Sequence, residues 1–135
     1  RVRCPVIIKT VNIEEELEKL TVMEGRTPET PDEEFENVFA TLAAFDMGGV
    51  FTGSYSGDSA WERHSVGDEL VHILKGKTEL TILTDEAAEV FYLEAGMITV
   101  VPKGLWHRFH APDGVTVLSV TPHPTDHSTA EDPRV

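Results

Sequence analysis

Apolar and polar residues alternate along most of the chain between residues 37 and 121, with the two-residue period of half-buried β-strands. Segments rich in Gly, Pro and Asp interrupt this alternation at roughly 8–12-residue spacing. The pattern predicts strands over residues 37–45, 50–56, 62–64, 69–74, 78–84, 89–93, 98–101, 107–111 and 115–121. Many short strands at this spacing indicate an all-β sandwich or barrel.

The alternating region defines a predicted β-domain over residues 37–122, with a flank on either side. Residues 1–36 are expected to form an N-terminal arm, a short helix and an acidic loop. Asn12 suits a helix N-cap, and apolar residues then recur at helical spacing over residues 13–22. Residues 123–135 have no periodicity and are expected to form a C-terminal tail, to which we assign no chemistry.

Two imidazoles and two carboxylates stand at suggestive positions on the predicted strands. Glu62 and His64 are two residues apart, so they share one face of a strand, with Cα atoms about 7 Å apart. Glu69 follows a turn at residues 65–68 that predicts a hairpin, and His107 begins a later strand. Such a set suits one divalent transition metal, for example iron, manganese, nickel or zinc.

The spacing of these residues resembles the two motifs of the cupin superfamily. In the first motif a His is followed by a Glu after three or four residues and by a Gly after six more, as in His64, Glu69 and Gly76. The second motif, a Gly, five residues, Pro-x-Gly, two residues and a His, is matched by Gly96, Pro102, Gly104 and His107. The resemblance implies an all-β fold, the double-stranded β-helix or jelly-roll cupin barrel, here with a short N-terminal helix.

The chain departs from the family pattern at two positions. Ala111 stands where the second motif usually has Asn, a change we expect to affect only packing or a turn. Glu62 stands where the family usually has its first metal-binding His. It is either a fourth ligand, whose charge makes the site neutral together with Glu69, or a general base beside a metal held by the other three residues. A surface carboxylate paired with Arg63 is the third possibility.

Apolar residues on the same strand faces predict the wall of a ligand pocket. Val71 and Ile73 share the face of Glu69, and Phe109 shares the face of His107. A pocket walled in this way would take a small, partly apolar ligand that presents one oxygen or carboxylate to the metal. His72 and His110 have the opposite parity and are expected to face away from the site.

The resemblance implies metal-dependent chemistry without choosing a reaction, because the family includes dioxygenases, isomerases, decarboxylases and lyases. We expect an enzyme of the dioxygenase, isomerase or lyase type that acts on a small organic molecule inside the barrel, with a slight preference for an oxygenase. In an isomerase or lyase, Glu62 would move the proton. The alternative is a non-catalytic cupin that binds or senses a small ligand such as a sugar.

Composition limits the partners of this 135-residue chain. The formal net charge of −13 argues against nucleic acid and anionic membranes, which require clusters of Lys and Arg. Cys4 is the only cysteine, no apolar run reaches the length of a membrane span, and no signal-peptide pattern is present, so the cytoplasm is expected.

Leu70, Leu74 and Trp106 lie on the strand faces that point away from the candidate site, where their apolar side chains would be exposed to solvent unless another surface covers them. Because members of the cupin family commonly form dimers, these residues predict a homodimer.

Overall fold

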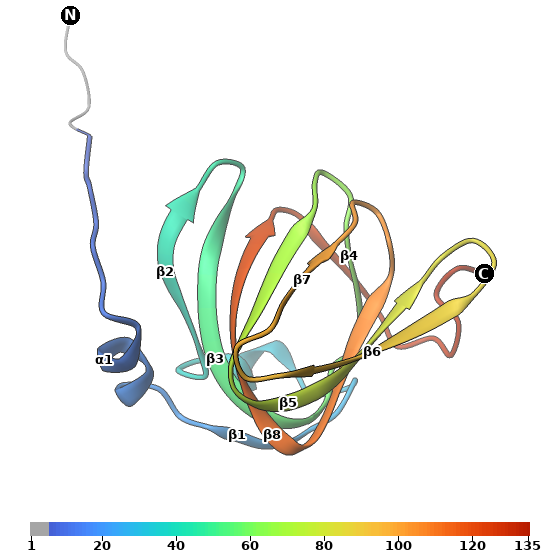
Figure 1. Cartoon of the computed structure of the whole chain (residues 1–135), viewed down its shortest axis with the longest axis horizontal. Helices are drawn as coiled ribbons and strands as arrows, with labels where there is room; N and C mark the ends of the chain where they lie inside the picture. Colours follow the sequence, from blue (N-terminus) through green and yellow to red (C-terminus); the bar gives the residue numbers. More distant parts are fainter. Residues whose placement is uncertain (1–5) are drawn as a thin grey trace, which may run out of the picture.

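The computed structural model describes residues 6–135 and shows a curled, nine-stranded sheet that forms a barrel (Figure 1). Its elements in chain order are α1 (Ile13–Glu18), β1 (Met23–Arg26), a 3-10 helix (Asp32–Phe35), β2 (Phe39–Phe45), β3 (Gly48–Asp58), β4 (Trp61–His64), β5 (Glu69–Leu83), β6 (Ala88–Glu94), β7 (Ile98–Val101), β8 (His107–Pro122) and β9 (Thr125–Ser128). The expected all-β architecture with one short α-helix is therefore confirmed.

Two long strands connect the parts of the barrel. β8 pairs antiparallel with β3, with β5 and, at its start, with β4. β5 also pairs with β6 and β7, β2 pairs with β3, and β1 runs parallel to β3. β5 and β8 were each expected as two short strands, but both continue through their bends.

Gly76 explains why β5 continues through its bend. Its φ is +74°, and a Cβ atom there would lie 2.3 Å from the carbonyl oxygen of Gly114 on β8. Only glycine accommodates both this backbone conformation and this close approach. The motif glycine therefore marks a bend within one strand and not the end of a strand.

The predicted hairpin between residues 62–64 and 69–74 is wrong. β4 pairs with β8 and β9, whereas β5 pairs with β6, β7 and β8. The turn at residues 65–68 carries the chain from one part of the barrel to another. This crossing is tethered by hydrogen bonds from the Gly104 N–H to the His64 carbonyl (2.9 Å) and from the Lys103 N–H to the Asp68 carboxylate (2.7 Å).

The flanks also differ from expectation. α1 begins at the predicted N-cap, where the Asn12 side chain accepts a hydrogen bond from the Glu15 N–H, but it ends at Glu18. The Thr21 N–H then bonds the Asn37 carbonyl (2.7 Å), which directs the chain into β1. At the other end, part of the expected tail forms β9, which pairs with β4.

Inward-facing residues of β3, β5, β6, β7 and β8 form the core, as the period-two pattern predicts. The buried cluster consists of Tyr55, Val71, Ile73, Leu80, Ile82, Leu93, Val101, Phe109, Ala111 and Val115. Ala111, the departure from the second motif, is fully buried among them, so its side chain contributes to the core.

The N-terminal arm projects away from the barrel over residues 6–12 (Figure 1). Cys4 and Pro5, which belong to the expected arm, lie outside the described residues. Within residues 6–135 no helix is long and apolar enough to cross a membrane. The cytoplasmic location expected from the sequence stays a prediction.

Candidate metal centre

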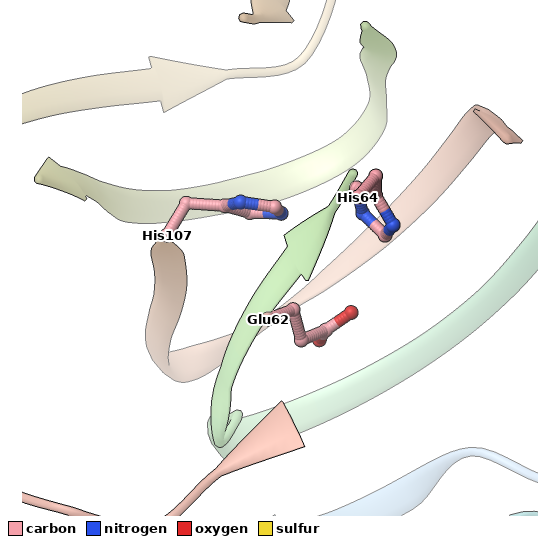
Figure 2. A group of neighbouring side chains, drawn as sticks. All are labelled: Glu62, His64 and His107. Atoms are coloured by element: carbon pink, nitrogen blue, oxygen red, sulfur yellow. The ribbon is translucent and has the colours of Figure 1, made fainter. Parts of the chain in front are cut away.

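Neighbouring strands bring three of the four predicted ligands together. Glu62 and His64 project from the same face of β4, and His107 begins β8 directly opposite Glu62 in the strand register. Their donor atoms all lie within 4.8 Å of one another, and Figure 2 shows the three side chains gathered at one place. The spacing of two residues on β4 and the β4–β8 pairing together produce this convergence.

The carboxylate of Glu69 joins the two imidazoles. Its Oε1 lies 3.1 Å from His107 Nε2, and its Oε2 lies 3.3 Å from His64 Nε2. Thr121 Oγ1 donates a further hydrogen bond to Oε2 at 2.6 Å. All four predicted ligands therefore belong to one continuous cluster, although β5 supplies Glu69 without pairing with β4.

Both imidazole rings are oriented by contacts on their other nitrogen. His107 Nδ1 lies 3.1 Å from the Leu105 carbonyl oxygen, to which it donates, and His64 Nδ1 lies 3.0 Å from Thr125 Oγ1. Each contact leaves Nε2 facing the cluster. Metal-ligating histidines in proteins are held in this way by a partner on the second nitrogen.

Burial and hydrogen bonding act in opposite directions on the charges of the cluster. Burial of Glu69 raises the pKa of its carboxyl group, but the hydrogen bond from His107 and the close contact with His64 outweigh burial and hold that pKa at about 2. Burial lowers the pKa of His107, yet its hydrogen bond to Glu69 and the nearby negative charges raise it overall. Glu69 is therefore an anion that stabilises positive charge beside it.

The donor set fits a borderline divalent metal. His64 Nε2 is buried and makes no hydrogen bond among the described residues, which is unusual for a buried polar atom. Imidazole nitrogen and carboxylate oxygen, without sulfur, are ligands that suit iron, manganese, nickel and zinc. The cluster could therefore hold one such ion.

The cluster opens into a cavity of about 270 Å³ inside the barrel. Its lining consists of Arg26, Asp32, Phe35, Phe39, Phe51, Tyr55, Glu62, His64, Glu69, Val71, Phe109, Val117, Ser119, Thr121, His123, Thr125 and His127. Val71 and Phe109 are thus placed where the strand parity predicts. Ile73 is completely buried in the core and is not among the lining residues.

The histidines of opposite parity lie away from the cavity. His110 is exposed and contacts the Asp58 carboxylate on the neighbouring strand β3. His72 is half-buried, beside Leu118 of β8 and Ile98 of β7. Neither residue lines the cavity, as parity predicts.

Sequence reasoning missed the contributions of the flanks to this cavity. His127 of β9 lies opposite Glu62 in register, and His123 also lines the cavity, although both belong to the tail to which the sequence assigned no chemistry. Arg26 of β1 and Tyr55 of β3 were likewise not singled out. The Thr125-x-His127 alternation was the available signal for β9, but a four-residue strand is too short for periodicity to reveal reliably.

Comparison with known proteins adds a family match. The family model described as Cupin domain matches residues 51–121, which is just over half of the chain and includes all four predicted ligands. No curated protein sequence matches the chain.

Solved structures share the fold at low sequence identity. A cupin-2 domain containing protein from Shewanella frigidimarina is 21% identical, with a TM-score of 0.55 over 63% of this chain and 79% of that one. Hydroquinone 1,2-dioxygenase, in complex with Cd²⁺ and 4-hydroxybenzonitrile, is 18% identical, with a TM-score of 0.53 over 62% of this chain and 63% of that one. Oxalate decarboxylase from Bacillus subtilis, with Mn(II) centres, is 14% identical, with a TM-score of 0.56 over 66% of this chain and only 26% of that one. Similarity at these identities shows the fold.

Proposed function

We propose that this chain, which belongs to the cupin family, binds one divalent transition metal and acts as a metal-dependent enzyme on a small organic molecule inside its barrel. The main support for this proposal is that the possible ligand atoms of Glu62, His64 and His107 all lie within 4.8 Å of one another. The carboxylate of Glu69 also contacts both imidazoles. Nitrogen and oxygen donors that converge at this distance, two of them buried, are suited to share one cation.

His64 and His107 would bind the metal through Nε2, and Glu69 through its carboxylate. Glu62 is the proposed fourth ligand, because its carboxylate lies within 4.8 Å of both imidazole donors. Its side chain is 18% exposed and lines the cavity, so it could instead act as a general base toward a bound molecule. A Glu62→Gln variant separates these roles, since loss of a ligand lowers metal affinity and loss of a base lowers turnover alone.

A metal bound in this cluster would supply Lewis acidity, and iron or manganese would add redox chemistry. The protein contributes a cavity whose apolar walls, including Val71 and Phe109, exclude water from a bound molecule. Oxygenation is the first reaction class to test, because one fold neighbour is a dioxygenase and the ligand set suits iron.

We also propose that the protein is a homodimer. Directly opposite residues share a face of a sheet, so Ile98 and Val100 of β7 lie beside Leu70 of β5 on the outside of the barrel. Ile98 is 60% exposed and Val100 is 49% exposed. This outer apolar face, defined as Leu70, Leu74, Ile98, Val100, Leu118 and Val120, surrounds His72 and is suited to a second copy. Trp106 is covered within the chain by the Arg63 guanidinium, 4.5 Å from its ring centre.

Metal content measured by elemental analysis tests the proposed site. After reconstitution with iron, manganese, nickel or zinc, we expect about one ion per chain, which His64→Ala and His107→Ala should each abolish. His110→Ala is the matched control, because His110 lies on β8 but outside the cavity. Wild-type protein that retains no metal after reconstitution would refute the metal site.

Turnover distinguishes an enzyme from a binding protein. An oxygenase with iron bound should consume oxygen when its substrate is added, and His107→Ala should not. Saturable binding with the ligand recovered unchanged, across oxygen-dependent and oxygen-independent assays, would instead establish the non-catalytic alternative.

A further inference from the structure

The cavity contains a buried positive charge that the proposed metal site does not use. Among the described residues that line it, Arg26 is the only Arg or Lys. Its side chain is 13% exposed, and its guanidinium carbon lies 4.8, 5.7 and 4.6 Å from the ring centres of Phe35, Phe39 and Tyr55. Arg26 is therefore held in an aromatic cage at the wall of the cavity.

The donors of this guanidinium are poorly satisfied. Arg26 Nε is buried without a hydrogen-bond partner among the described residues. Nη2 lies 3.8 Å from Glu62 Oε1, beyond hydrogen-bonding distance. The aromatic rings stabilise the cation through their faces, and of the three only Tyr55 carries an oxygen that could accept one of its in-plane N–H groups. Burial of a charged donor without an acceptor, as at Nε, is unfavourable, so an anion that reaches this guanidinium would stabilise the arrangement.

The backbone places Arg26 at this position specifically. β1 runs parallel to β3 with Arg26 opposite Gly57, and a Cβ atom on Gly57 would lie 2.2 Å from the Arg26 carbonyl oxygen. The φ of Gly57 is +104°, so glycine is required for both reasons. β1 can approach the barrel closely enough to insert Arg26 only because residue 57 has no side chain.

In the structure Arg26 has a counterion in the Glu62 carboxylate, 3.8 Å away, which metal binding would take from it. Once a divalent ion is bound, the carboxylates of Glu62 and Glu69 match its two charges. Asp32 also lines the cavity, but it is exposed, where water screens its charge. One negative charge on a bound molecule would therefore neutralise the interior.

We propose that Arg26 is a substrate-binding residue, and that the ligand of this cavity is a small monocarboxylate with an apolar body. The carboxylate lies on the guanidinium, and the apolar body lies against the walls formed by Phe35, Val71 and Phe109. The rest of the molecule is thereby placed beside Glu62 and His64. The cavity of about 270 Å³ is smaller than the ~300–1,000 Å³ typical of drug-sized ligands, which limits the ligand to a small molecule. This inference names the substrate class of the proposed metal site and rests on that proposal.

Pairs of a carboxylate and its neutral amide test whether Arg26 binds a carboxylate. Benzoate is compared with benzamide, and 3-methylbutanoate with 3-methylbutanamide, by calorimetric titration of zinc-loaded and metal-free full-length protein. Because a charge-assisted, bidentate hydrogen bond replaces a neutral one, at least one carboxylate should bind roughly 10- to 100-fold more tightly than its amide. Arg26→Met should remove most of this preference while metal content stays at the wild-type level.

Two further variants make the result specific to Arg26. Arg63→Met removes the same charge from β4, but Arg63 pairs with Asp126 and does not line the cavity, so the preference should persist. Arg26→Lys keeps the positive charge but loses the planar guanidinium that can bind a carboxylate through two hydrogen bonds. The preference for the carboxylate over its amide should therefore be intermediate.

Equal binding of acid and amide by the wild type, or a preference that Arg26→Met retains, would overturn the inference. The wild-type comparison alone can do so even if a variant fails to fold. Metal content, measured on the same samples, reports separately on the proposed metal site. A preference that depends on Arg26 in protein that holds no metal would support the inference while refuting the metal site.

Discussion

At the scale of single residues, Glu69 organises the site. It is 5% exposed, contacts both imidazoles and accepts a hydrogen bond from Thr121. A buried carboxylate is tolerated because hydrogen bonds and positive charge compensate for its lost hydration. Thr121 is therefore more than a polar residue of β8, since its hydroxyl is one of the groups that make this burial possible.

Replacement of Thr121 by Val should destabilise the metal-free protein by about 1.5–3 kcal/mol, because it removes a hydrogen bond to a buried charged group. Urea denaturation measures the free energy of unfolding. Thr116→Val is the control, since Thr116 is equally buried on the same strand but shares its hydrogen bond with the neutral Ser54 hydroxyl. We expect about 0.5–1.5 kcal/mol there. Equal losses in the two variants would contradict a special role for the Glu69 contact.

At the scale of elements, β4 is a four-residue strand that depends on its neighbours. It is paired along its whole length with β9, and in the described structure its partner on the other side is the start of β8. Thr125 of β9 contacts His64 Nδ1 directly. The C-terminal segment therefore completes the site and does not merely follow the barrel.

Thr125→Val should weaken metal binding roughly 10-fold, because the partner that orients a ligating imidazole is lost. Competition with a chromophoric chelator measures the affinity. Ser128→Ala, at the end of the same strand, removes a hydroxyl that bonds only the nearby Ala130 N–H, and it should leave the affinity unchanged. Unaltered affinity in Thr125→Val would show that His64 does not need this contact.

At the scale of the whole molecule, two exposed apolar surfaces bear on the proposed assembly. One is the outer apolar face of β5, β7 and β8. The other is the N-terminal arm, where Val6, Ile7 and Ile8 are 85–89% exposed. Exposed apolar patches of this kind commonly mark protein interfaces, which supports the proposed homodimer.

Ile98→Glu should shift the proposed dimer to monomer, because a carboxylate in a buried apolar interface is strongly unfavourable. Light scattering coupled to size-exclusion chromatography measures the mass. Val90→Glu places the same charge on β6, outside the outer apolar face, where Val90 is 46% exposed, and the mass should not change. A wild-type protein that is monomeric at high micromolar concentration would contradict the proposal.

The sequence alone determined most strands of the barrel, the inward face of several of them and the four residues proposed as metal ligands. Period-two alternation is a local property, and it correctly placed Val71 and Phe109 toward the cavity and His72 and His110 away from it. The resemblance to the cupin motifs singled out Glu62, His64, Glu69 and His107, but their convergence depends on the β4–β8 pairing and on the position of β5.

Only the tertiary structure decided which strands pair and what else reaches the cavity. β4 and β5 are adjacent in sequence but do not pair, and Gly57 and Gly76 each contact backbone that is distant in sequence. Arg26 and His127 join the site through β1 and β9, elements of four residues each. Such short strands are stabilised by the sheet they join more than by their own sequence, so no local sequence pattern predicts them.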